Sequence, residues 1–404
     1  MKFEVAYFDK LSMPFMERQE DIDLYVLKKI AQRIKEIKNL STTDLNTLQQ
    51  YLRSNNDIFE IEYTLAKLFQ QQKDNIKSII TTAARDSYNE CKPLFAYKKE
   101  KFIPFDDYSD IQDLVTLTLV ALSTVYDELS SDIGFNKINR VINKKQSNTS
   151  IIPIAKTYSD ILDIAIQAKR TPKIDFNLSI RPYIQQLIDS RLKTNIGTQT
   201  NPHIRNFDTA SNNLITNNIK DIILAIQNKV ADILGADGKE LSAHLNSAPD
   251  HEPAQGHQFT NEEFEKMQSG RNFVDLQGRF YVGFERPIGA WNCRHITRSI
   301  FCGKTKPWYT DEELQKIIDD NAKGYTFPDG KHLTMYECTQ QQRRMEAKIR
   351  HLKKACIVTD ILNDEVLSNK YRTQIANEMA KYNSFSKACG LSPQYKRTAV
   401  KDYK

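Results

Sequence analysis

Histidine and cysteine side chains, which bind metals and transfer protons, are concentrated in one stretch of this 404-residue chain. Five of them lie between residues 242 and 295: His244, His251, His257, Cys293 and His295. The chain has seven histidines and six cysteines in all, and no other stretch gathers as many of these groups. A metal site and a catalytic centre are therefore the two kinds of chemistry to weigh.

The donor types fit zinc, which is usually held by four Cys and His ligands in a tetrahedron. Two local pairs can supply them, His244 with His251 and Cys293 with His295, and His257 can substitute for one member. However, His-x6-His is not a standard ligand spacing, and Cys-x-His is a short one. The same side chains also fit a small polar core in which the histidines form hydrogen bonds and Cys293 packs. The sequence leaves both interpretations open.

Catalysis by these residues, with or without a metal, is a further alternative. Cys293 beside a histidine can act as a nucleophile with its base, and His251-Glu252 can supply acid and base for hydrolysis. Against this, the chain has no HExxH, G-x-S-x-G or P-loop motif. We therefore assign no catalytic residue and favour a role without enzymatic activity.

The residues around this window predict a mainly α-helical protein in three parts. Residues 1–235 form a long helical region, residues 236–330 a small α+β module with the His/Cys cluster, and residues 331–404 a basic helical tail. Apolar residues at helical spacing mark one face of the first helix: Ile22, Val26, Leu27, Ile30, Ile34 and Ile37. Similar periodicity predicts further helices near residues 57–90, 109–130, 155–170, 178–193, 210–234 and 366–388.

Local signals set the expected element ends within the module. Thr260 and Thr310 each begin a Thr-x-x-Glu sequence, which is typical of a capping box that opens a helix. Gly235 stands where a glycine would end the preceding helix. Residues 279–284 are a short β-like run, and polar stretches at 147–150 and 195–202 are typical of loops.

Composition excludes several classes of protein. The longest apolar run, residues 114–122, is far shorter than the ~20 residues of a membrane span, so we expect a buried core helix there. The first ten residues mix acids and bases and do not resemble a secretory signal. The six cysteines are scattered without a C-x-x-C, which indicates reduced thiols and folding in a cytoplasm.

Positive charge is concentrated in the last part of the chain. Residues 331–404 hold 15 Lys and Arg against 7 Asp and Glu, a balance of +8, so the first 330 residues carry about −2 of the chain's net +6. Such a tail can contact nucleic acid without reading its sequence, or it can simply be a solvated helix face. The candidate nucleic-acid contacts are Arg343, Arg344, Lys348, Arg350, Lys353 and Lys354.

The order of residues in the window resembles the phage minor capsid protein 2 family. Members carry Ser-x-His, then Pro-x-His with Gln-Gly shortly after, then Gly-x-Trp-Asn-Cys-Arg-His; here these are residues 242–244, 249–251, 255–256 and 289–295. The motif residues beside the metal candidates are Gln255, Gly256, Trp291, Asn292 and Arg294. Further similarity lies at residues 20–27, 235–237, 342–350 and 385–391, so that only residues 40–205 lack a recognisable anchor.

The chain departs from the family pattern at two positions. Ala248 and Ala254 stand where members tend to have Arg and Trp, so any binding role of that arginine is in doubt here. The family is similar in plan to the Mu F-like head morphogenesis proteins, which have an Asn-Cys-Arg-Cys element. Residues 292–295 look like that element with His295 in place of the last Cys, which adds to the argument for zinc as a cofactor.

The resemblance implies a virion protein of a tailed phage, assembled in the host cytoplasm. It would act with the portal in head assembly or in genome packaging and delivery. The implied partners are the portal protein, the major capsid protein and packaged DNA, with several copies on a portal ring and no membrane. Two alternatives remain at this stage: a metal-assisted nuclease or hydrolase delivered with the genome, and a non-specific DNA-binding protein.

Overall fold

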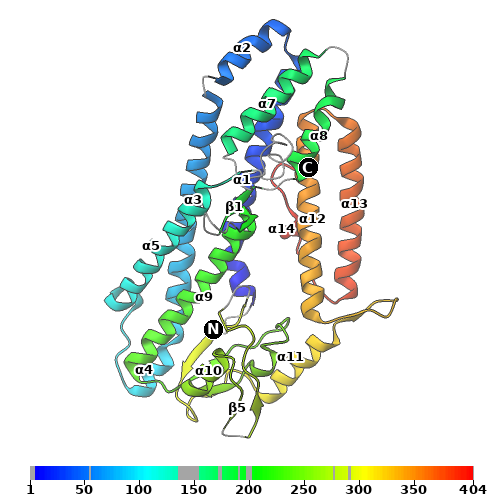
Figure 1. Ribbon diagram of the computed structural model, residues 1–404. Coiled ribbons are helices and arrows are strands. Elements are labelled where there is room, and N and C mark those ends of the chain that lie inside the picture. Colours follow the sequence, from blue (N-terminus) through cyan, green and yellow to red (C-terminus); the bar gives the residue numbers. More distant parts are fainter. Residues whose placement is uncertain are drawn as a thin grey trace. The chain divides into compact units, whose positions relative to one another are not determined.

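The computed structural model describes residues 5–53, 56–134, 154–171, 175–189, 192–196, 203–275, 278–289 and 293–403 (Figure 1). Helices account for 69% of the structure and the strands are short, which confirms a mainly α fold with a small α+β region. The helices are α1 (Val5–Asn39), α2 (Thr42–Arg53), α3 (Asn56–Glu90), α4 (Lys92–Lys98), α5 (Ser109–Ser131), α7 (Ile154–Arg170), α8 (Phe176–Asp189), α9 (Phe207–Leu234), α10 (Asn261–Gln268), α11 (Asp311–Lys323), α12 (Met335–Ile361), α13 (Glu365–Ala388) and α14 (Tyr395–Thr398).

The strands pair in four small antiparallel sheets. They are β1 (Lys193–Asn195), β2 (Ile204–Asn206), β3 (Gly238–Leu241), β4 (Gln258–Thr260), β5 (Phe273–Val274), β6 (Phe280–Tyr281), β7 (Thr297–Ile300), β8 (Tyr325–Thr326) and β9 (His332–Leu333). Short 3-10 turns lie at Phe105–Asp107 and Glu252–Ala254.

The chain forms two compact units, each drawn from three separate segments. Unit 1 contains Met1–Pro14, Asp74–Thr124 and Asn212–Gln341, and unit 2 contains Phe15–Lys73, Val125–Ser211 and Gln342–Lys404. Long helices such as α1 and α3 contribute residues to both units, so a helix end is not a unit boundary here. The three-part domain division made from the sequence stays a prediction.

Apolar periodicity located the long helices well. The predicted face of α1, from Ile22 to Ile37, is buried, and α9 ends at Leu234, just before Gly235, whose φ of +65° favours glycine. The run at residues 114–122 lies in α5, as expected for a helix, but it is buried on one face only. Leu117 and Val120 are 69% and 62% exposed. The two polar stretches predicted as loops lie largely outside the described residues.

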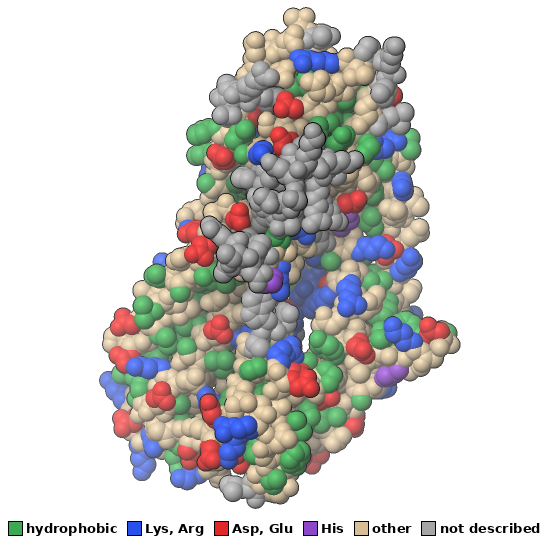
Figure 2. All heavy atoms as spheres, viewed as in Figure 1, with side chains coloured by type: hydrophobic (Ala, Val, Ile, Leu, Met, Phe, Trp, Pro, Cys, Tyr) green, Lys and Arg blue, Asp and Glu red, His purple; other side chains and the backbone are tan. Residues whose placement is uncertain are grey.

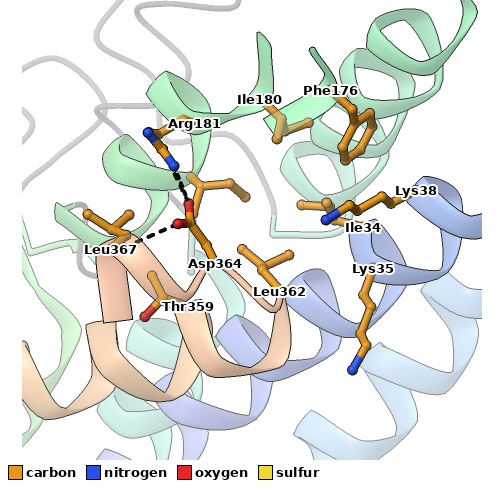
Figure 3. Close-up of a pocket in the computed structure, with 11 residues that line it drawn as sticks. Ile34, Lys35, Lys38, Phe176, Ile180, Arg181, Thr359, Leu362, Asp364 and Leu367 are labelled. Atoms are coloured by element: carbon orange, nitrogen blue, oxygen red, sulfur yellow. Dashed lines mark hydrogen bonds and ion pairs between the residues drawn. The ribbon is translucent and has the colours of Figure 1, made fainter. Parts of the chain in front are cut away.

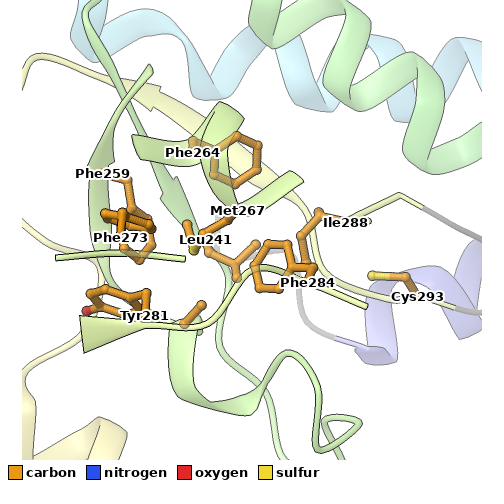
Figure 4. Close-up of a cluster of buried hydrophobic side chains, with 10 residues drawn as sticks. Leu241, Phe259, Phe264, Met267, Phe273, Tyr281, Phe284, Ile288 and Cys293 are labelled. Atoms are coloured by element: carbon orange, nitrogen blue, oxygen red, sulfur yellow. The ribbon is translucent and has the colours of Figure 1, made fainter. Parts of the chain in front are cut away.

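Unit 1 holds the α+β module. Its three-stranded sheet has the order β4-β3-β7, with Glu240 of the central strand opposite Gln258 and Arg298. Both predicted capping boxes are present, at Thr260 before α10 and at Thr310 before α11. The sheet and α10 enclose an aromatic cluster, with Cys293 at one end of it beyond Phe284 and Ile288 (Figure 4).

In unit 2, α12 and α13 lie side by side and are joined by buried polar contacts (Figure 1). Gln342 donates to Ser386 Oγ at 2.9 Å, and Tyr382 donates to Glu346 at 3.0 Å. Within the described ranges, every helix is too short or too polar to serve as a membrane span. None of the six cysteines, all of which lie among the described residues, forms a disulfide.

Candidate metal centre

The sheet brings the two halves of the predicted cluster together. Just beyond the β3–β7 pairing, Ser242 N donates to Ile296 O at 2.9 Å, and Ile296 N donates to Ser242 Oγ at 3.1 Å. One backbone bond and one side-chain bond therefore hold the two segments together beyond the last strand pair. As a result, the segment that starts with Ser242 and the segment that ends with His295 leave the sheet next to each other.

A tight turn then carries the chain back to the sheet at the Gln255-Gly256 motif. Gly256 N donates to Leu241 O at 2.9 Å, and Gly256 has a φ of +75°. A Cβ at this position would lie 2.0 Å from Leu314 Cδ2, so the backbone here passes directly against the Leu314 side chain of α11. Glycine is required for both its conformation and its size.

Changing Gly256 to Ala is expected to lower the free energy of unfolding more than Gly303→Ala does. Both glycines have positive φ, but a Cβ at Gly303 meets nothing within 4 Å. The difference between the two variants should be about 1–3 kcal/mol, which is the usual cost of overpacking. Chemical denaturation of both variants measures it, and equal losses would contradict the close approach to Leu314.

Three of the four predicted ligands converge on one point. Cys293 Sγ lies 3.6 Å from His251 Nδ1 and 3.8 Å from His295 Nδ1, and these three atoms all lie within 4.8 Å of one another. Around a tetrahedral zinc, with Zn–S of ~2.3 Å and Zn–N of ~2.0–2.1 Å, sulfur and nitrogen are about 3.5 Å apart. The group therefore has nearly the spacing that a metal ion needs.

The outer nitrogens of both histidines are held by protein acceptors. His251 Nε2 lies 2.5 Å from Arg286 O, and His295 Nε2 lies 3.3 Å from Ser247 Oγ and 3.4 Å from Gln255 Oε1. Metal-binding histidines almost always have such a partner on the nitrogen that does not bind the metal. Arg286 is in turn held by Asp250, at 3.1 Å between Nη2 and Oδ1.

The contact between Cys293 and His251 shifts the pKa values of the two groups in opposite directions. Burial alone raises the pKa of Cys293, but the hydrogen bond with His251 and backbone contacts with Gly289 and His295 outweigh it, and the net pKa is lowered. Burial likewise lowers the pKa of His251, yet contacts with Cys293 and the Arg286 carbonyl raise it overall. A thiolate is the form of cysteine that binds metals.

His244 lies beside this group without belonging to it. Its ring centroid is 4.3 Å from that of His295, its Nδ1 lies 3.0 Å from Leu245 O, and its buried Nε2 has no hydrogen-bond partner among the described residues. Burial lowers the pKa of His244 to about 4, so the ring is neutral at pH 7. His257, the possible substitute, instead faces Arg279, at 3.2 Å between Nδ1 and Nη1.

Of the remaining motif residues at positions 291, 292 and 294, the structure describes only the last. Trp291 and Asn292 lie outside the described residues, whereas Arg294 forms an ion pair with Asp9 at 3.4 Å. Sequence reasoning missed Ser247 and Arg286, which hold the two histidines. Ser247 has no local signal, and the contribution of Arg286 is a backbone carbonyl, which every residue carries.

The six candidate nucleic-acid contacts on α12 are largely engaged within unit 2. Lys354 is buried between Glu20 and Asp23, Arg350 pairs with Glu20 at 3.1 Å, and Lys353 donates to Thr398 O at 2.8 Å. Arg343 and Lys348 pair with Glu346 and Glu378, at 3.5 and 2.9 Å.

Of the six, Arg344 and Lys348 are the two with exposed side chains. On the face drawn in Figure 2, Lys and Arg side chains are interspersed with Asp and Glu. This distribution leaves few cations of α12 ready to contact phosphate.

If the tail contacts DNA through Arg344 and Lys348 alone, binding will depend only weakly on salt. Each phosphate contact contributes about −0.9 to the slope of log affinity against log salt, so we expect a slope of about −2 or shallower. Arg344→Ala should reduce it by about 0.9, and Lys370→Ala, an exposed cation on α13, should not. Fluorescence anisotropy with duplex DNA at several salt concentrations measures this, and a slope steeper than about −4 would show that other cations take part.

A separate pocket lies in unit 2 between α1, α8 and the α12–α13 turn (Figure 3). Ile180, Leu362 and Leu367 give it an apolar wall, and Lys35 and Lys38 lie at its side. Asp364 accepts from Arg181 Nη2 at 2.8 Å and from Leu367 N at 3.2 Å, which caps α13. No residue that the sequence singled out as a site lines this pocket.

Comparison with known proteins gives one match. The family model described as phage minor capsid protein 2 matches residues 6–387, nearly the whole chain, and so covers most of both units and all residues of the His/Cys cluster. No curated protein and no solved structure shows significant similarity to the chain.

Proposed function

Because the chain belongs to the phage minor capsid protein 2 family, we propose that it acts with the portal of a tailed phage in head assembly or genome packaging and delivery. The match over residues 6–387 carries this proposal, since it includes nearly the whole chain. The family supports a phage capsid role directly, and the portal is the partner that we add.

The geometry of the His/Cys cluster supports a structural rather than a catalytic role. His251 and His295 are each 1% exposed and Cys293 is 3% exposed, so a substrate has no direct path to the three reactive groups. Their outer atoms are all occupied by protein partners. Within this function, we assign zinc to the cluster as a structural cofactor that holds the α+β module in one conformation.

Sedimentation with assembly partners tests the proposed function. The purified chain, mixed at micromolar concentration with portal rings or with procapsids of the same phage, should sediment with them at a fixed ratio. Procapsids that lack the portal separate a portal contact from a contact with the major capsid protein. Failure to sediment with either particle would contradict the proposal.

The enzymatic alternative makes an opposite prediction. A metal-assisted nuclease would cleave DNA or RNA, and His251→Ala would abolish that cleavage. We expect equal, negligible cleavage by the wild type and the variant in the presence of zinc, magnesium or manganese. Metal-dependent cleavage that is lost in His251→Ala would favour an injected enzyme.

A further inference from the structure

The protons of the cluster can be counted from its hydrogen bonds. Arg286 O and the Asp250 carboxylate, which lie 2.5 and 3.4 Å from His251 Nε2, can only accept, so that nitrogen carries the proton. His251 Nδ1 is then a bare lone pair, and it faces Cys293 Sγ.

The proton of His295 can be placed in the same way, from the partners of its Nε2 atom. Gln255 Oε1 accepts from the backbone N–H of His244 at 3.1 Å, which identifies it as the amide oxygen. Ser247 donates its own hydroxyl proton to Ala248 O, so its Oγ is free to accept. Both partners of His295 Nε2 are therefore acceptors, and His295 Nδ1 is a second lone pair that faces Cys293 Sγ.

His244 supplies a third lone pair. Its Nδ1 lies 3.0 Å from Leu245 O, which can only accept, so Nδ1 carries the proton and Nε2 does not. That Nε2 is buried and has no partner among the described residues. A buried acceptor without a donor is costly, and native folds rarely tolerate one without a reason.

Among the contacts that the structure gives these three nitrogen lone pairs, the one donor is the Cys293 thiol, which has a single proton. It can satisfy one of them, which leaves two buried acceptors without a donor. A divalent cation bound by the thiolate satisfies all of them at once. Cysteine thiolate and imidazole nitrogen are the ligand types of tetrahedral zinc sites, and cobalt(II) can substitute for zinc as a spectroscopic probe.

We infer that His244 Nε2 is the fourth ligand of this centre, which completes a closed tetrahedral site with Cys293 Sγ, His251 Nδ1 and His295 Nδ1. The inference rests on the structural zinc proposed above and adds the ligand atoms and the coordination number. His244 Nε2 lies outside the group of three atoms within 4.8 Å, so its ring, which already lies against that of His295, has to shift toward the metal. A site closed in this way ties residues 244–251 to residues 293–295 and has no open position for a substrate.

Cobalt(II) titration of the metal-free full-length chain tests the inference. We expect one equivalent to bind, with a sulfur-to-cobalt charge-transfer band and the intense d–d bands of tetrahedral coordination. X-ray absorption of the wild-type zinc protein should give one sulfur and three nitrogen neighbours, which needs no variant. Octahedral d–d bands, or a shell with two or more water-like oxygens, would overturn the closed site.

His244→Ala and His257→Ala form a matched pair, since both remove an imidazole from the same module. His244→Ala should weaken zinc binding at least tenfold and add an exchangeable water to the cobalt site, whereas His257→Ala should bind as the wild type does. Equal behaviour of the two variants would exclude His244 as a ligand. A wild-type chain that binds no metal but still sediments with portal rings would overturn the metal centre and leave the capsid function in place.

Discussion

Chelation of the proposed zinc is expected to lower the unfolding temperature of unit 1 by roughly 8–16 °C. A ligand at a thousand times its Kd stabilises the folded state by about 4 kcal/mol, and each kcal/mol shifts a unit of this size by roughly 2–4 °C. In the proposed site, the metal adds bonds between the two ligand segments, around His251 and around Cys293, so its removal should weaken the connection between them. Differential scanning calorimetry with and without a zinc chelator measures the shift.

Two variants serve as controls for this prediction. Cys293→Ser should already unfold at the lower temperature and should not respond to the chelator. His257→Ala, which leaves all four proposed ligands in place, should show the full shift. If the wild-type unfolding temperature is the same with and without the chelator, the chain has no structural metal.

Glu240→Ala is the substitution with the largest expected effect outside the metal centre, at about 3–5 kcal/mol of unfolding free energy. Glu240 is fully buried in the central strand β3. Its carboxylate accepts from Arg298 Nε at 2.8 Å, from Gln258 Nε2 at 3.1 Å and from Trp308 N at 2.6 Å. Arg298 Cζ lies 4.3 Å from the centroid of the Trp308 ring. Removing the Glu240 carboxylate therefore leaves the guanidinium charge in this packed position without its ion-pair partner.

Urea denaturation with matched variants separates this contact from an ordinary ion pair. Glu262→Ala removes the exposed partner of Lys266 in the same module and should leave the denaturation midpoint unchanged. Glu240→Leu combined with Arg298→Leu should recover part of the loss, because it removes both charges together. A midpoint for Glu240→Ala equal to that of Glu262→Ala would show that the buried pair contributes nothing.

Features set by neighbouring residues could be predicted from the sequence. The capping boxes at Thr260 and Thr310 involve atoms three residues apart, so the local pattern was sufficient to place α10 and α11. The apolar faces of α1 and α9 follow from one helical period in the same way. For α5, the pattern predicted a helix but not its exposed face, because exposure depends on what packs against it.

Features set by tertiary contacts could not be predicted. The sequence indicated His251, Cys293 and His295 as ligand candidates from their types, and the structure brings these three together. The sequence did not show that Ser247 and the Arg286 carbonyl hold the two imidazoles, or that Glu240 pairs with Arg298. Those partners are 35 to 58 residues apart along the chain, so no local pattern links them.

The net charge of the basic tail, residues 331–404, likewise did not show which of its cations are paired within the fold. Its balance of +8 correctly describes composition, but most of the candidate cations on α12 are used to hold unit 2 together. Lys354 is the clearest case, since Glu20 and Asp23 lie more than 300 residues away along the chain. A count of charges therefore overestimates how many of them are ready to bind DNA.

Cross-linking mass spectrometry on purified virions tests the central claim most directly. Lysines of this chain should form cross-links with the portal protein, at a copy number set by the portal ring rather than by the capsid shell. Cross-links only to tail proteins, or to the major capsid protein at shell-like copy number, would contradict a role at the portal.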